Sequence, residues 1–168
     1  ISIGLNHIIV LTNEQRVYAW GSNIYGQLGI DNNVTAFAKN PVYIKYLTNK
    51  YIISVTCGDE CSFFLSKTGL VLSCGNGING CLGNGSIDNQ CQTQIIQSLI
   101  RQVIIVYYSN IFNSVDVTTI TACKLFVLAL TKNFRIYVWG NFSSFDNETD
   151  KPSTNTPKAY TYSKRNIM

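Results

Sequence analysis

Short runs of β-branched and aromatic residues alternate with polar turns along most of the chain. In the first part, residues 7–12 (HIIVLT) and 16–20 (RVYAW) flank the polar triplet NEQ. Two such runs around a short polar turn are typical of a β-hairpin. No window keeps the 3.6-residue period of an amphipathic helix, and helix-favouring residues are scarce. The pattern therefore predicts an all-β fold.

The hairpin pattern is repeated along the chain. Residues 4–29 align without a gap on residues 58–83, at a separation of 54 residues (58 minus 4). A third copy follows at an offset of 65 residues (140 minus 75), and the extra residues lie between Cys91 and Val115. The shared positions are Gly4/Gly58, Leu11/Leu65/Leu130, Gly21/Gly75/Gly140, Gly26/Gly80, Leu28/Leu82, Gly29/Gly83 and Trp20/Trp139. The chain is therefore an array of about three units.

Each unit continues after its hairpin with further β-type runs, such as residues 41–47 and 51–57. Four strands per unit at this period fit a blade of a β-propeller better than a helical repeat. We expect repeat 1 over residues 1–54, repeat 2 over residues 55–115 with an insertion near 91–115, and a degenerate repeat 3 with a polar tail over residues 116–168.

The long motif of the first copy resembles the repeat of the regulator of chromosome condensation family. The matching residues are Gly4, His7, Leu11, Thr12, Val17, Tyr18, Trp20, Gly21, Asn23, Tyr25, Gly26, Gln27, Leu28 and Gly29. The second copy has Cys61 and Cys74 in place of the histidine and the tryptophan, and the third copy loses the glycine turn after Asn141. The resemblance implies a seven-bladed propeller of four-stranded blades, of which this chain would supply about three.

The glycines that follow each hairpin are expected to serve the backbone. Gly21 and Gly26 recur as Gly75 and Gly80, although the residues between them change from SNIY to NGIN. Glycine adopts positive φ and allows close approach of neighbouring strands. We expect the leucines of the turn and the two tryptophans to anchor the core. The predicted structural motif comprises Gly4, His7, Trp20, Gly21, Gly26, Leu28, Gly29, Gly58, Gly75, Gly80, Leu82, Gly83, Trp139 and Gly140.

Residues 75–80 (GNGING) also match the G-x-G-x-x-G pattern of dinucleotide-binding sites. In such a site the last glycine opens a helix whose N-terminus meets the pyrophosphate. Here the chain continues as CLGNGS, which cannot sustain a helix, and the first copy has Asn23 in place of the middle glycine. We therefore expect no nucleotide and no other cofactor to bind here.

Composition and charge narrow the choice of partner. Charged residues make up only 13% of the chain, the net charge is +4, and the one basic cluster is the terminal YSKRNIM. These values do not predict a nucleic-acid partner. No apolar run approaches the length of a membrane span, and no signal peptide is recognisable. We expect an intracellular protein, cytoplasmic or nuclear, and the start on Ile1 suggests a piece of a longer chain.

The six cysteines and the single histidine are expected to be structural. No C-x-x-C pair is present, and Cys61, Cys74 and Cys123 occupy repeat positions that are internal in the sister units. This pattern predicts free buried thiols in a reducing compartment and no metal site. His7 is replaced by Cys61 and Phe126 in the other copies, so a catalytic role is not expected. We predict that the chain is not an enzyme.

The polar segment from residue 142 to residue 168 allows two interpretations. Its part TPKAYTY (156–162) is similar to NPVYIKY (40–46) and would then form the outer strand of the third blade. Otherwise the segment is a disordered linker.

Two functional classes follow from the family resemblance. One is a protein–protein interaction scaffold, a module that larger members of the family attach to other domains such as ubiquitin ligases and kinases. The other is a guanine-nucleotide exchange factor for a Ran-type small GTPase, the activity of the founding member. Fold-level analogy does not decide between them. The expected partners are a protein, with a small GTPase as one candidate, and the remaining blades of a longer chain.

Overall fold

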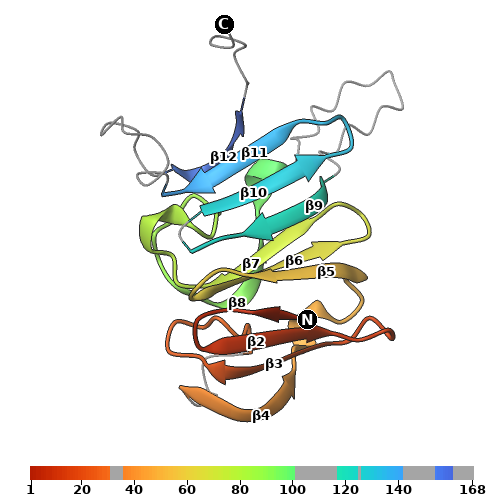
Figure 1. The fold of residues 1–168 in the computed structure, drawn as a ribbon, viewed down its shortest axis with the longest axis vertical. Helices are drawn as coiled ribbons and strands as arrows, with labels where there is room; N and C mark the ends of the chain where they lie inside the picture. The colour runs from red at the N-terminus through yellow and green to blue at the C-terminus, as the bar shows by residue number, and fades with distance from the viewer. Residues whose placement is uncertain (31–35, 101–116, 125, 142–153, 161–168) are drawn as a thin grey trace, which may run out of the picture.

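The computed structural model describes residues 1–30, 36–100, 117–124, 126–141 and 154–160. These residues form three four-stranded antiparallel sheets, stacked in chain order in Figure 1. We call each sheet a blade. The described residues contain no α-helix, and no helix among them is long and apolar enough to cross a bilayer. The predictions of an all-β fold and of a partial propeller are confirmed.

The bounds of the strands follow the repeat. Blade 1 contains β1 (Ser2–Ile3), β2 (His7–Leu11), β3 (Val17–Ser22) and β4 (Phe37–Tyr43); blade 2 contains β5 (Ile52–Cys57), β6 (Cys61–Ser66), β7 (Val71–Gly75) and β8 (Gln90–Ile95); blade 3 contains β9 (Val117–Ala122), β10 (Phe126–Thr131), β11 (Ile136–Gly140) and β12 (Thr154–Tyr160). Three short 3-10 turns are η1 (Lys45–Leu47), η2 (Ile78–Gly80) and η3 (Gln97–Leu99).

The order of strands places β4, β8 and β12 at one edge of their blades. The expected boundary between residues 54 and 55 falls inside β5, which pairs with β6. Of the predicted insertion near 91–115, only residues 91–100 are described. The polar tail contributes β12, which pairs with β11 from Tyr160 to Thr154. The outer-strand interpretation of residues 156–160 is therefore confirmed, and residues 142–153 and 161–168 lie outside the described part.

The hairpins that join the two middle strands lie at the same end of every blade. Their turns close with equivalent hydrogen bonds from Gln15 N, Gly69 N and Phe134 N to the carbonyl three residues earlier. We call this side the hairpin end; it also holds the connection from residue 44 to residue 51, whose last carbonyl accepts Lys67 N. The opposite side, which carries the glycine turns, is the turn end. Figure 1 shows the hairpins on the right and the glycine turns on the left.

The hydrophobic cores lie between the blades. One cluster joins Ile9, Val17 and Ala19 of blade 1 to residues of blade 2 that include Phe64 and Leu72. A second cluster joins blade 2 to blade 3. Strands β6 and β7 are accordingly buried at every position, whereas β2 and β10 alternate between buried and more exposed residues. Blades 1 and 3 therefore each pack against another blade through only one of their two faces within the described residues.

Candidate interaction surfaces

A glycine near the end of each third strand interrupts the pairing with the outermost strand. Gly21, Gly75 and Gly140 have φ of +102°, +112° and +99°, and the register to β4, β8 or β12 shifts just before each of them. A positive φ at such a shift is typical of a glycine β-bulge. In blades 1 and 2 the chain continues from this bulge into the glycine turn.

Each glycine turn packs against the following blade. A Cβ added at Gly26 would collide with the backbone of Cys91 in β8, and one added at Gly80 would collide with the backbone of Asn155 in β12. Leu28 and Leu82, at the base of the two turns, are fully buried. The turn of one blade is therefore part of the contact with the next blade.

A side chain at the end of each third strand completes this contact. Trp139 Nε1 donates a hydrogen bond of 2.8 Å to the carbonyl of Cys81 in the turn of blade 2. The indole lies so close to Gly83 that a Cβ there would come within 2.6 Å of Nε1. In blade 2 the equivalent residue is Cys74, whose Sγ lies 3.5 Å from the carbonyl oxygen of Gln27 and near Gly29.

The third equivalent residue, Trp20, differs from these two. Trp139 is fully buried, as expected, but Trp20 is only partly buried against the first core cluster. No hydrogen bond joins its indole to any described residue of the chain. Trp20 belongs to blade 1, so the turn that would cover it by analogy with the other two contacts would belong to a blade before blade 1. The expectation that Trp20 anchors the core is therefore met only in part.

Gly4 and Gly58 allow a second close approach between blades. A Cβ at Gly4 would collide with the His7 ring and with the Gly58 carbonyl, and one at Gly58 would lie 2.7 Å from Cys61 Sγ and 3.1 Å from the Cys123 carbonyl. Cys123 occupies the equivalent position in blade 3 and is exposed. The prediction that Cys123 is internal is wrong, because no blade covers this side of blade 3 within the described residues.

His7 links blade 1 to blade 2. It is 2% exposed, and its Nε2 lies 2.9 Å from Ser62 Oγ, which donates to the carbonyl of Gln27 at 2.7 Å. Burial lowers the pKa of His7 from 6.5 to about 4, despite a hydrogen bond with the Cys61 backbone that raises it. The imidazole is therefore neutral near pH 7. Its partners are structural, and its Nδ1 has no hydrogen bond within the described chain.

All six cysteines are free thiols, and Cys57, Cys61, Cys74 and Cys81 are buried. Burial raises the pKa of Cys57 and of Cys74. A hydrogen bond between Cys61 and Cys81 raises the pKa of the first and lowers that of the second. In the described ranges, no three His, Cys, Asp or Glu side chains gather as metal ligands would.

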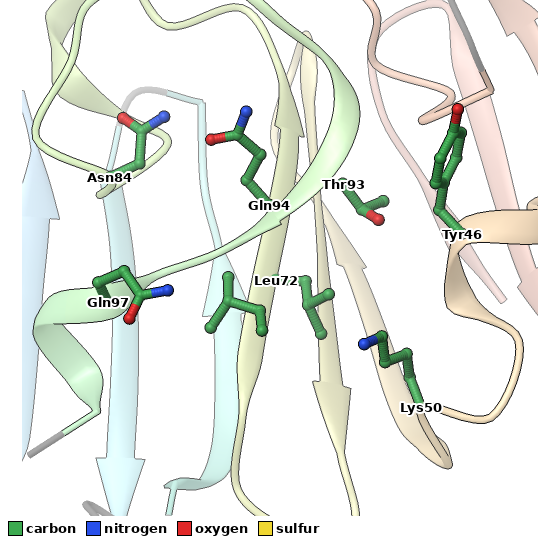
Figure 2. Close-up of a pocket in the computed structure, with 8 residues that line it drawn as sticks. Tyr46, Lys50, Leu72, Asn84, Thr93, Gln94 and Gln97 are labelled. Atoms are coloured by element: carbon green, nitrogen blue, oxygen red, sulfur yellow. The ribbon is translucent and has the colours of Figure 1, made fainter.

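A groove lies at the outer rim between η1 and β8. Its volume is about 430 Å³, and its lining includes Tyr46, Lys50, Leu72, Thr93 and Gln97. Figure 2 shows Lys50 and Gln97 directed toward Leu72 from opposite sides. Among the described residues that line it there is no His, Cys, Asp or Glu. Its described lining mixes apolar and polar side chains and includes one cation, Lys50.

Sequence reasoning missed the turn carbonyls of Gln27 and Cys81, which accept the bonds from the next blade. Any residue type can supply a backbone carbonyl, so the sequence does not mark these acceptors. It marks only the glycines beside them. The available signal was the alignment of Cys74 with the two tryptophans, which marks one position for a donor in all three copies.

Comparisons with known proteins agree with this geometry. The model of the regulator of chromosome condensation (RCC1) repeat matches residues 14–65. The chain is 33% identical over 147 residues to the human E3 ubiquitin-protein ligase HERC2, a match that covers 86% of the chain and 3% of HERC2. It is 34% identical over 98 residues to the regulator of chromosome condensation of Drosophila melanogaster, covering 58% of the chain and 18% of that protein.

Among solved structures, Prp20p of Saccharomyces cerevisiae superposes with a TM-score of 0.75 at 20% identity. The superposition covers 95% of the chain and 37% of Prp20p. At this identity the likeness shows the fold alone. The chain spans well under half the length of each of these proteins, so it corresponds to a part of their architecture.

Proposed function

Because this chain is built of repeats of the regulator of chromosome condensation family, we propose that it is a segment of a protein–protein interaction scaffold. The observation that carries the proposal is the position of the cores, which lie between blades and leave one face of each outer blade uncovered by any other described residues. A blade of this kind is complete only against a neighbour. The described blades therefore act as part of a larger binding surface.

The uncovered faces are apolar. On blade 3, Leu130 and Ile136 pair directly and are 36% and 42% exposed. On blade 1, Trp20 occupies the position of Trp139 in blade 3, whose indole binds the glycine turn of blade 2. Further blades of the same protein fit both faces, and the two ends of the array, hairpin and turn, then remain for other proteins.

The scaffold proposal includes no enzymatic activity, no cofactor and an intracellular location. The support for it comes from the residues that could have been catalytic or nucleotide-binding. His7 lies within hydrogen-bond distance of Ser62, and Gly80 of the G-x-G-x-x-G motif packs against blade 3. HERC2 is named as a ubiquitin ligase, and Prp20p is described as binding Gsp1p and histones. Protein partners are thus the expected class, with a small GTPase among them.

The alternative function is guanine-nucleotide exchange on a Ran-type small GTPase. The similarity to the Drosophila regulator and to Prp20p favours it. An exchange factor must bind the nucleotide-free GTPase more tightly than the loaded form, which requires a broad docking face. The third repeat has no glycine between residues 141 and 150, so its sequence lacks the glycine motif of the first two repeats. We therefore place the scaffold function first.

One pair of measurements tests the two functions. Release of fluorescent GDP from Ran is followed with substoichiometric intact protein, beside a pull-down of proteins that bind it. The scaffold function predicts bound partners and a release rate equal to that of Ran alone. Catalytic acceleration of release would instead establish the exchange factor and contradict the scaffold proposal.

A further inference from the structure

The hairpin end carries most of the positive charge of the described residues. The basic side chains there are all exposed: Arg16, Lys45, Lys50, Lys67, Lys132 and Arg135. Among the described acidic residues, only Glu14 lies at this end, and it pairs with Arg16 at 3.5 Å. Asp59 and Glu60 lie at the opposite, turn end, in the connection from β5 to β6. The hairpin end is therefore a cationic surface.

Two exposed aromatic residues stand among these cations in an unfavourable backbone conformation. Phe134 is 88% exposed with φ of +57°, and Tyr51 is 60% exposed with φ of +50°. A bulky residue at positive φ is a genuine outlier, because its Cβ crowds the backbone. Both lie next to a basic residue, since Arg135 follows the first and Lys50 precedes the second.

The fold itself does not explain the aromatic ring of Phe134. The same turn forms with Gln15 in blade 1 and with Gly69 in blade 2, through the same N–H to carbonyl bond. The hydroxyl of Thr131 accepts Arg135 N at 3.1 Å, which holds the turn independently of the residue at position 134. Strain at a residue that the fold does not require is a reason to look for a function.

We propose that the hairpin end docks an acidic protein segment with apolar side chains, which covers Phe134 and Tyr51 while its carboxylates meet the surrounding cations. Aromatic and arginine side chains are the residues that most often dominate protein interfaces. Complementary charge speeds association and selects the partner. The inference rests on the proposed scaffold function, for which it names one surface and the chemistry of its partner.

A protein partner fits this surface better than a nucleic acid does. Single strands follow a continuous basic groove lined with stacking aromatics. Here the cations stand near the tips of three separate hairpins and on one connection, and the groove between η1 and β8 contains one cation, Lys50, among its described lining residues. Separate charged contacts around an aromatic anchor are the pattern of a protein interface.

The test measures binding of the intact protein to a fluorescein-labelled peptide of repeated Glu-Leu-Glu units by fluorescence anisotropy. A Lys-Leu-Lys peptide and oligothymidylate serve as comparison ligands. Phe134→Asn removes the ring and relieves the strain, because Asn tolerates positive φ. Gln15→Asn is the matched control, since it makes the same change of backbone preference in the equivalent turn of blade 1.

We expect the acidic peptide to bind, and to bind less tightly as salt rises. Phe134→Asn should weaken binding about fivefold or more while the melting temperature stays equal or rises, and Gln15→Asn should leave binding unchanged. No binding of the acidic peptide, or equal binding by the Phe134 variant, would overturn the proposal. Tighter, Phe134-dependent binding of oligothymidylate would also overturn it and assign the surface to nucleic acid. GDP release is not part of this measurement, so the scaffold function and this surface can fail separately.

Discussion

At the scale of single residues, His7 makes the stability of the molecule depend on pH. Its folded pKa of about 4 lies below the value of 6.5 in an unfolded chain. Between these values the unfolded state binds the extra proton, so His7 stabilises the fold above pH 6.5 and loses this contribution as pH falls toward 4. The full effect is about 3 kcal/mol. Urea denaturation at pH 7 and at pH 4.5 measures it.

The control is His7→Cys, which introduces the residue that blade 2 has at this position. Other groups also titrate in this range, but the variant shares them. The loss of unfolding free energy on acidification should therefore be smaller in His7→Cys than in the native chain. Equal losses would show that His7 is not the buried neutral group described above.

Gly83 allows a second prediction, because two separate demands fall on it. Its φ is +70°, and an added Cβ would meet Trp139. Gly85 has a comparable φ of +88° but only a methyl group at 3.6 Å nearby. Gly85→Ala should therefore cost roughly 1 kcal/mol of unfolding free energy, from backbone strain alone. Gly83→Ala should cost clearly more, and equal values by denaturation would argue against the indole contact.

The positions that need positive φ could be predicted at the glycines, because glycine recurs at the same place in successive repeats. Phe134 and Tyr51 could not, because nothing in their identity announces a positive φ. At Phe134 the conformation comes from the hydrogen bonds of the turn, which the backbone makes with Phe as it does with Gly69. The sequence therefore predicts positive φ where glycine tolerates it, but not where the hydrogen bonds of a turn force it on another residue.

At the scale of elements, the contact between a third strand and the preceding turn predicts unequal roles for the tryptophans. Trp139→Ala removes a fully buried ring and should cost about 3–5 kcal/mol. Trp20→Ala should cost less in residues 1–168, because part of its ring is exposed and its indole has no partner among the described residues. Chemical denaturation of the two variants compares them directly. A cost for Trp20→Ala equal to that of Trp139→Ala would contradict the exposed position of Trp20.

Elements were predictable as far as their alternation was regular. The hairpins show a regular alternation of apolar runs and polar turns. Strands β2, β3, β10 and β11 lie where the apolar runs predict them. The sequence of strand β12, TNTPKAY, allows both interpretations because it is polar and contains a proline. Its place at the edge of the blade resolves this, since an edge strand tolerates proline and needs only one apolar face.

At the scale of the whole molecule, the two uncovered faces predict association. The isolated chain presents a partly buried Trp20 at one end and the Leu130–Ile136 pair at the other. Apolar faces of adjacent blades attract each other, and unclosed sheets add free edges. We expect light scattering to give masses above that of a single chain. A sharp monomer with a cooperative melt would contradict this expectation.

Charged substitutions on one face test whether the chain associates through its uncovered faces or because it is unstable. Leu130→Glu combined with Ile136→Lys keeps the pair complementary across the two strands and makes the face polar. The doubly substituted chain should associate less than the native one at equal concentration. Exposed substitutions away from both faces, such as Ile87→Glu, should leave the association unchanged.

The number of blades and their kind were readable from the repeat, whereas the exposure of the end residues was not. Cys123 illustrates the reason: its counterparts Gly4 and Gly58 lie against a following blade, and Cys123 has none among the described residues. An alignment transfers burial from one copy to the next as if every copy had the same neighbours. The first and last copies do not.

The sharing of each core between two blades also determines how the molecule comes apart. Removing blade 3 would take five of the thirteen buried residues of the second core with it and uncover Phe63, Leu65 and Val71. Blade 2 would then stand where blade 3 stood, as the new end of the array. Opening should therefore proceed from the ends inward, as a zipper opens, and amide protons of β6 and β7 should be the last to exchange with solvent.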